Sequence, residues 1–184
     1  MRVISGKVRG LKLISPPGED TRPTLDRVKE AVFSMISPFL IDAKVLDLFS
    51  GSGALGIESL SRGALNAVFV DNSNIAIKCI RSNIEAAKFD NVSTILQKDS
   101  AAFLKENKNS YDIIFLDPPY NKELIAAVLP YCANCLKDEG IILCETEKNE
   151  SLPEDVSGLE LVKEYRYGKA KVTSFRKKGE EVCE

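Results

Sequence analysis

Histidine and tryptophan are absent from this chain of 184 residues. Without an imidazole group, the chain cannot build a Ser-His-Asp triad, a Cys-His pair or a zinc site that needs histidine. Any catalysis must therefore use carboxylates, hydroxyls, amides, lysine, cysteine or a cofactor, and we expect no metal site. No apolar run approaches the ~18 residues of a membrane span, and the N-terminus does not resemble a signal peptide. These absences predict a cytoplasmic protein with no membrane partner.

The five cysteines do not form a disulfide framework, and reduced cytosolic thiols are the simplest explanation for them. Cys132 and Cys135 form a C-x-x-C pair in a stretch that we expect to be helical. A redox motif would need an activated thiolate at a helix N-terminus, and nothing in the sequence supplies one. We therefore interpret the pair as two small residues on one helix face.

The charge is nearly balanced overall but unevenly distributed along the chain. The net charge is −2, whereas residues 1–30 carry a balance of +3 and residues 163–178 a balance of +6 around an acidic middle. One interpretation is that these are ordinary solvated surfaces. The other is that both ends meet as one cationic surface that holds nucleic-acid phosphates. The candidates for such contacts are Arg2, Lys7, Arg9, Lys12, Arg27, Lys169 and Lys171.

Regular alternation of strand and helix patterns predicts an α/β protein with a Rossmann-like, mostly parallel sheet and an antiparallel last strand. Residues 2–14 indicate a short β-hairpin, and Thr24 is expected to cap the helix that follows it. We expect strands at 44–49, 67–71, 92–96, 111–117, 140–145, 159–167 and 171–176, and helices at 54–62, 74–88, 100–106 and 122–136. The predicted organisation is a hairpin and helix extension (1–40) packed on the core, a main domain (41–178) and an acidic tail (179–184).

A glycine motif lies between the first predicted strand and its helix. It reads Gly-Ser-Gly-Ala-Leu-Gly over residues 51–56, and Asp71 follows about twenty residues later at the end of the next strand. Glycines allow the backbone to approach a ligand, and a carboxylate after the second strand can accept hydrogen bonds from ribose hydroxyls. The motif predicts an adenosine-containing cofactor, but by itself it does not distinguish a dinucleotide from S-adenosylmethionine (SAM).

Two further features favour SAM. Asp47, at the end of the first strand, would repel a pyrophosphate but suits a ligand with ammonium and sulfonium groups. Asp117-Pro118-Pro119-Tyr120 ends the fourth strand, where two prolines remove backbone donors and leave carbonyl and carboxylate acceptors. Such acceptors beside an aromatic ring suit a planar base with an exocyclic amino group, whose lone pair could then attack a methyl group.

The motifs DLFSGSGALGIESLSRGA, FVD and FLDPPY resemble those of class I SAM-dependent methyltransferases that modify exocyclic amino groups. RVISGKVRGLKL and RPTLDRVKEAVFSMI resemble, more narrowly, the RsmD family, bacterial enzymes that methylate guanine N2 at position 966 of 16S rRNA. The resemblance runs from Arg2 to about Arg176. It implies a partner in 16S rRNA or the assembling small ribosomal subunit; the oligomeric state stays open, with a monomer favoured.

The resemblance also implies roles for individual residues. Arg22 and Thr24 would close over the carboxylate of SAM, and Asp117, Pro118 and Tyr120 would hold the flipped guanine, with Pro119 beside them. The expected cofactor-binding residues are Arg22, Thr24, Asp47, Ser50, Gly51, Gly53, Asp71, Asn72, Asp99 and Ser100. Among them, Gly51 and Gly53 would pass under SAM, Asp71 would bind its ribose and Asp99 its adenine amine.

Three alternatives compete with this interpretation. An NAD-linked oxidoreductase could use Tyr165 and Lys169 as a Tyr-x-x-x-Lys pair, but the intervening Gly168 and flanking strand patterns argue against a shared helix face. A second alternative is a non-catalytic RNA-binding or ribosome-assembly module on a methyltransferase fold. The third is an adenine-N6 methyltransferase, although the chain length leaves little room for a separate domain that recognises a DNA sequence.

Overall fold

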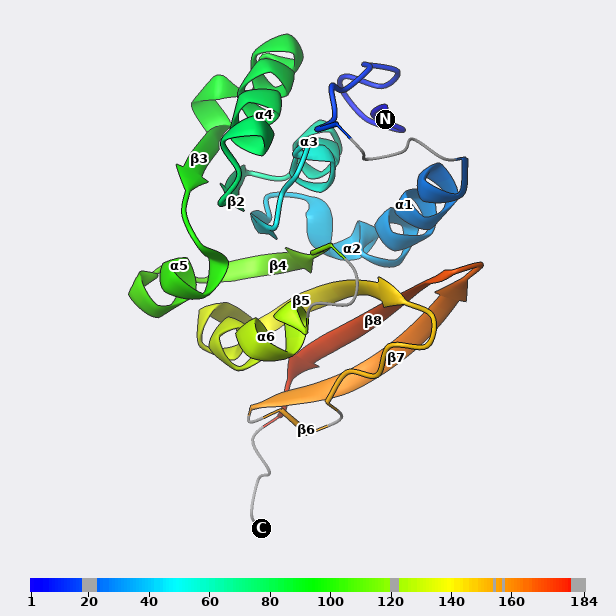
Figure 1. Ribbon diagram of the computed structural model, residues 1–184, viewed down its shortest axis with the longest axis vertical. Helices are drawn as coiled ribbons and strands as arrows, with labels where there is room; N and C mark the ends of the chain where they lie inside the picture. The colour runs from blue at the N-terminus through cyan, green and yellow to red at the C-terminus, as the bar shows by residue number, and fades with distance from the viewer. Residues whose placement is uncertain (18–22, 120–122, 154, 157, 180–184) are drawn as a thin grey trace.

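An eight-stranded sheet forms the centre of the computed structural model, which describes residues 1–17, 23–119, 123–153, 155–156 and 158–179 (Figure 1). The strand order is β3-β2-β1-β4-β5-β8-β7-β6. The strands are β1 (Lys44–Leu48), β2 (Asn66–Asp71), β3 (Ser93–Gln97), β4 (Tyr111–Leu116), β5 (Leu136–Glu147), β6 (Asp155–Val156), β7 (Leu159–Tyr167) and β8 (Ala170–Lys177).

The pairing confirms the predicted Rossmann-like fold class. Strands β1 to β5 run parallel, and β8 pairs with β5 in the antiparallel direction. The β7–β8 hairpin then extends the same edge of the sheet. Tyr165 lies in β7 and Lys169 in the turn after it, so the two share no helix face.

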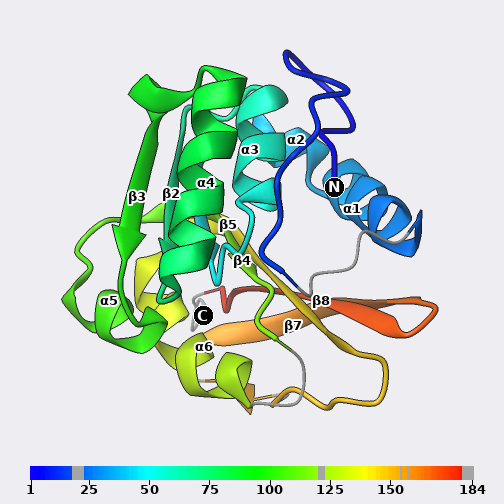
Figure 2. The same ribbon diagram turned by 45° about the horizontal axis from the view of Figure 1, so that its top comes forward.

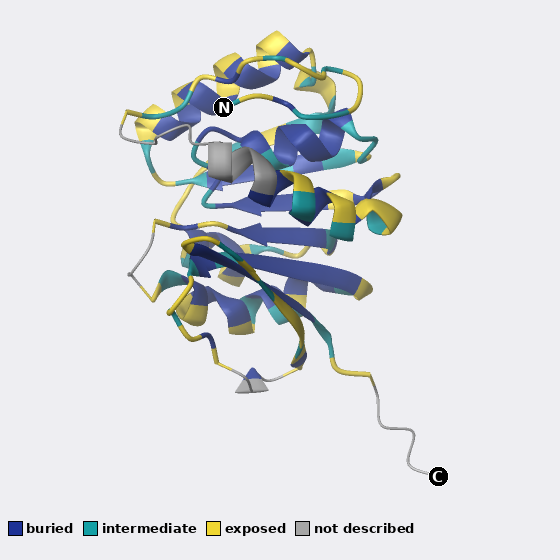
Figure 3. Cartoon of the chain, turned by 90° about the vertical axis from the view of Figure 1, so that its right-hand side faces the viewer, coloured by how far each residue is buried: buried dark blue, intermediate teal, exposed yellow. Residues whose placement is uncertain are grey.

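Helices cover both faces of the sheet, and most of the strand residues are buried (Figure 3). They are α1 (Pro23–Met35), α2 (Ser37–Leu40), α3 (Ala54–Ser61), α4 (Asn74–Ala87), α5 (Ser100–Glu106) and α6 (Leu124–Cys135), with a 3₁₀ turn at Asp90–Val92. Side chains alternate across each strand. Phe115 therefore joins the core under α1, α3 and α4, whereas Ile114 and Leu116 join the core under α5 and α6. None of the helices in the described residues is long and apolar enough to cross a membrane.

Residues 1–14, the N-terminal loop, keep the expected hairpin in a short and irregular form. Arg2 and Lys12 form one antiparallel β-bridge, and the Val3 and Leu13 amides donate to the Leu11 and Met1 carbonyls, each at 2.9 Å. Amides between these two paired segments donate to α3. Ile4 and Ser5 donate to the two carboxylate oxygens of Glu58 at 2.7 and 2.9 Å, and Lys7 donates to the Ser61 carbonyl at 2.8 Å. The loop therefore packs against the helix layer (Figure 2).

Two element boundaries also differ from expectation. Helix α1 begins at Pro23, so Thr24 lies in its first turn and does not precede it. Proline is favoured at the first helical position because its missing N–H would be unpaired there anyway. Strand β5 begins four residues before Gly140, because Leu136 already pairs with Tyr111 ahead of a bulge in the ladder.

The four cysteines within the described residues behave as the sequence predicts; Cys183 lies outside them. Cys79, Cys132, Cys135 and Cys144 are free and buried. Burial raises the pKa of the Cys132 and Cys135 thiols, which disfavours the reactive thiolate. Both thiols lie in α6, in the core between that helix and the sheet.

Candidate active site at the carboxyl edge of the sheet

A pocket of about 560 Å³ lies where β1, β2, β4 and β5 end. Ten of the residues expected to bind SAM or the target base line it together. They are Asp47, Ser50, Gly51, Asp71, Asn72, Asp99, Ser100, Asp117, Pro118 and Pro119. These residues span 73 positions of sequence, and the parallel strands bring them to one edge of the sheet.

The loop after β1 turns sharply at the carboxyl edge of the sheet, next to the pocket. Phe49, Gly51 and Gly53 have φ angles of 66°, 54° and 76°, in the left-handed region that favours glycine. The Gly51 amide donates to Asp71 Oδ2 at 2.9 Å, and the other oxygen of Asp71 accepts from the Ser73 amide at 2.8 Å. Asp71 therefore fixes the loop after β1 to the start of α4.

Asp47 is almost fully buried, with 1% of its surface exposed. Its Oδ2 accepts a hydrogen bond from the Gly56 amide at 2.9 Å. Burial raises the pKa of this carboxyl group to about 7; the Gly56 hydrogen bond opposes that shift, and the nearby Asp71 charge adds to it. Asp47 therefore holds the first turn of α3 through Gly56 and also lines the cavity.

The structure does not place Gly53 among the pocket residues, contrary to expectation. A Cβ atom at Gly53 would lie 3.3 Å from the Phe69 ring, and one at Gly56 only 2.3 Å from it. These two glycines allow α3 to approach β2. Among the motif glycines, Gly51 is the one that lines the pocket.

Other expected residues divide into three groups. Asp99 lines the pocket and caps α5 by accepting from the Ala102 amide at 2.9 Å. Tyr120 and Arg22 lie outside the described residues, and the side chains of Thr24 and Arg27 are likewise not described. Arg2, Lys7, Arg9, Lys12 and Lys169 are exposed.

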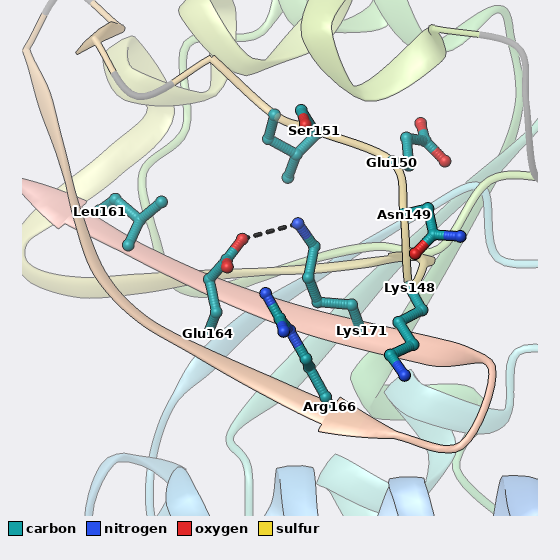
Figure 4. A pocket seen from close by; sticks show the side chains of 9 residues that line it. Lys148, Asn149, Glu150, Ser151, Leu161, Glu164, Arg166 and Lys171 are labelled. Carbon is teal, nitrogen blue, oxygen red and sulfur yellow. Dashed lines mark ion pairs between the residues drawn. The ribbon is translucent and has the colours of Figure 1, made fainter.

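Lys171 is a correction to the predicted RNA-contacting set. Only 6% of its side chain is exposed, and its ammonium nitrogen lies 2.7 Å from Glu164 Oε1. It lines a second pocket of about 560 Å³ between β7, β8 and residues 148–152, where Figure 4 shows it beside Arg166 and Lys148. Successive side chains of β8 point to opposite faces of the sheet. Because Val172 lines the first pocket, Lys171 points away from it.

Sequence reasoning missed several residues of the first pocket. Lys29 is 5% exposed, donates to the Arg2 carbonyl at 2.5 Å, and lies 3.1 Å from Glu58. No motif signalled this position. Glu145 also lines the pocket, and its position as the last residue of the strand predicted at 140–145 could have identified it. No group of three or more metal-ligating side chains occurs among the described residues.

The strand order defines a Rossmann-like fold with a pocket at the carboxyl edge of its sheet, and similar proteins identify it as the fold of a methyltransferase. The solved Escherichia coli structure "Putative methyltransferase yhhF" shares the fold with a TM-score of 0.86, at 31% identity over 97% of this chain and 98% of that one. The family model described as conserved hypothetical protein 95 matches residues 1–176. The chain belongs to this family, the RsmD family.

Two relatives share much of the sequence. "Putative rRNA methyltransferase YlbH" of Bacillus subtilis (strain 168) is 37% identical over 184 residues, covering 97% of this chain and all of the relative. "Ribosomal RNA small subunit methyltransferase D" of Escherichia coli (strain K12) is 34% identical over 155 residues, which cover 83% of this chain and 78% of the relative. The structure of SMU.776 in complex with SAH, at 17% identity and a TM-score of 0.65, covers 77% of this chain and 48% of that one and shows a similar fold.

Proposed function

We propose that this protein transfers a methyl group from SAM to the exocyclic N2 amino group of a guanine in small-subunit rRNA, at position 966 of 16S rRNA. The single observation that carries the proposal is one pocket that joins an acidic cofactor half to the Asp117-Pro118-Pro119 acceptors. The names of the relatives support an rRNA substrate. Such a substrate would place the protein in the cytoplasm.

The cofactor half of the pocket fits SAM in its charge. Asp47, Asp71 and Asp99 line it, and three carboxylates suit a ligand with sulfonium and ammonium groups better than one with a pyrophosphate. Burial raises the pKa of Asp47 to about 7 and the nearby Asp71 charge adds to that shift, so a bound cation would stabilise its ionised form. We propose that Asp47 faces the amino-acid portion of SAM, Asp71 its ribose and Asp99 its adenine. When bound, SAM supplies the methyl group as an electrophile.

The other half of the pocket would hold and activate the target amine. Pro118 and Pro119 have no backbone N–H, so their carbonyls and the Asp117 carboxylate present acceptors without competing donors. Asp117 and the Pro118 carbonyl would accept the two N–H bonds of the amino group and localise its lone pair on nitrogen. That lone pair then forms the bond to the methyl carbon as the carbon–sulfur bond breaks and its electrons remain on sulfur. The extra proton on nitrogen leaves afterwards, so no histidine is needed.

RNA binding would use the exposed basic residues of the N-terminal loop and Lys169. Val3 and Leu13 of the loop share a core cluster with Ala170 and Val172 of β8, so the loop packs on the face of the sheet toward which these two β8 side chains point. Extruding a base costs a few kcal/mol, and one aromatic stack returns ~1–3 kcal/mol. We propose that Tyr120 provides that stack and that phosphate contacts and Asp117 supply the remaining free energy.

The proposal is tested by transfer of labelled methyl from SAM to ribosomal RNA and to partly assembled small subunits, followed by nucleoside analysis. The expected product is N2-methylguanosine at one position of the small-subunit rRNA. N6-methyladenosine would overturn the choice of base. The absence of labelled nucleoside from every substrate would overturn the activity and favour a non-catalytic assembly module.

A further inference from the structure

Two carboxylates lie just beyond the last paired residues of neighbouring strands β4 and β5, in the base half of the pocket. Past that point β5 continues to Glu147, paired with β8. Strands β4 and β5 are parallel neighbours (Figure 1), and their last paired residues are Leu116 and Cys144. Asp117 and Glu145 follow directly, and both line the pocket. Strand neighbours lie about 5 Å apart, so the two carboxylates reach adjacent positions on a ligand.

The floor beneath these carboxylates is apolar. Phe115 and Leu143 pair across β4 and β5 and line the pocket, and Val172, the partner of Glu145 on β8, lines it as well. Phe115 and Val172 each expose only 1% of their surface. A flat, apolar floor next to hydrogen-bond acceptors suits the face and edge of a nucleobase, and low polarity strengthens the hydrogen bonds made there.

Guanine and adenine present different groups beside their amino nitrogen. Guanine carries N1–H next to its N2 amino group, which gives three adjacent donor hydrogens. Adenine carries an unprotonated N1 next to its N6 amino group, so a lone pair would face any carboxylate at that position. Asp117 is used for the amino group in the proposed reaction, which leaves the neighbouring carboxylate to face N1.

We propose that Glu145 is a specificity-determining residue that accepts the N1–H of the target guanine and thereby excludes adenine. The inference rests on the proposed function, because it assumes that Asp117 holds the amino group that is methylated. A site that is built to hydrogen-bond a substrate N–H discriminates strongly against an analogue that lacks it. Glu145 thus supplies the distinction between the two bases that the Asp-Pro-Pro-Tyr motif does not make.

The test compares guanosine with 2-aminopurine riboside at the methylated position of the same rRNA fragment. 2-Aminopurine keeps the N2 amino group but has an unprotonated N1. The wild-type protein should prefer guanosine in kcat/KM by roughly 10- to 100-fold, as expected for a hydrogen bond to a charged group. In Glu145→Gln the amide can donate to the N1 of 2-aminopurine, so the preference should fall to within about threefold of unity.

Glu139→Gln is the matched control, because it removes an exposed carboxylate at the other end of the same strand. It should keep the wild-type preference, and both variants should bind SAM as the wild type does, which shows that they are folded. If the wild type methylates guanosine and Glu145→Gln keeps its full preference, the role of Glu145 is wrong while the proposed function stands.

If the wild type methylates neither RNA, the proposed function fails, and a binding measurement still decides the role of Glu145. GMP and 2-aminopurine riboside 5′-monophosphate are titrated into the complex with S-adenosylhomocysteine. Tighter binding of GMP by the wild type, lost in Glu145→Gln, supports base selection by this residue. Equal affinity for the two nucleotides in the wild type contradicts it.

Discussion

Asp47 and Gly56 are joined by a 2.9 Å hydrogen bond from the helix amide to a carboxylate that is 1% exposed. This bond ties the end of β1 to the first turn of α3. It does not fully offset the cost of burying the charge, because the pKa of Asp47 remains raised to about 7. The folded protein therefore retains a proton on this group at pH values where the unfolded chain, with an ordinary pKa of 3.8, has lost it.

This relationship predicts a pH-dependent stability. Between pH 5 and 7 the native state binds more protons at Asp47 than the unfolded state does, so the free energy of unfolding falls as the pH rises, by at most about 1.4 kcal/mol per unit. Asp47→Asn keeps an acceptor for Gly56 but does not titrate, so its slope should be shallower. Chemical denaturation at pH 5, 6 and 7 measures both slopes. With no histidine in the chain, identical slopes would show that the Asp47 pKa is not raised.

Gly56→Ala should destabilise the protein by about 1–3 kcal/mol, the usual cost of overpacking. The new Cβ would lie 2.3 Å from the Phe69 ring, and this ring is fully buried and cannot retreat freely. Gly179→Ala is the control, since nothing lies within 4 Å of the position that its Cβ would occupy. Urea unfolding of the two variants tests the prediction, and equal stability would mean that α3 does not need this glycine to approach β2.

Glu58→Gln should cost about 3–5 kcal/mol of stability, because it breaks a buried ion pair. Glu58 is fully buried and contacts Lys29 at 3.1 Å, Arg62 at 2.8 Å and the amides of Ile4 and Ser5. The change removes the negative charge that faces Lys29 and Arg62, and it weakens the acceptors that hold the N-terminal loop.

Glu106→Gln provides the comparison for Glu58. Glu106 pairs with Lys98 at a comparably short distance, 2.7 Å between the ammonium nitrogen and the carboxylate oxygen, but both side chains are largely exposed. Exposed ion pairs contribute little to stability, so the thermal midpoint of Glu106→Gln should match that of the wild type. Equal midpoints for Glu58→Gln and Glu106→Gln would contradict the assigned role of the buried pair.

Local patterns predicted those parts of the fold that depend on neighbouring residues. Helix α5 begins at Ser100 and ends at Glu106 as expected, because Asp99 caps it from the adjacent position. The N-terminal loop could not be predicted in the same way. Its amides bind Glu58 and Ser61, more than fifty residues away, and periodicity within residues 2–14 carries no information about that helix.

The candidate site likewise contains residues that local patterns identify and residues that only tertiary packing brings in. Asp47, Asp71 and Asp117 were identifiable because each lies at or near the end of a predicted strand, and the ends of parallel strands meet at one edge. Lys29 enters the pocket from α1 only through tertiary packing. Lys171 was misassigned because charge counted along the sequence does not show that Glu164, on the neighbouring strand, pairs with it.

Charge reversal in the N-terminal loop should weaken RNA binding without changing the affinity for SAM. Lys7→Glu and Arg9→Glu each replace an exposed cation with an anion, and each should flatten the dependence of RNA affinity on salt concentration. Lys108→Glu makes the same change just before β4, at the end of that strand opposite the pocket, and should have little effect. Filter binding over a salt series distinguishes the three variants. Unchanged RNA affinity in both loop variants would mean that this surface is simply solvated.

In the proposed reaction, Asp117 holds the amino group that receives the methyl group. The most direct test measures methyl transfer to small-subunit rRNA and SAM affinity side by side in the wild type and in Asp117→Ala. The wild type should form N2-methylguanosine. Asp117→Ala should form less than roughly 1% as much, in line with the loss of an activating contact made in the transition state, and should bind SAM with nearly unchanged affinity. An Asp117→Ala protein that methylates guanine at the wild-type rate would contradict the account.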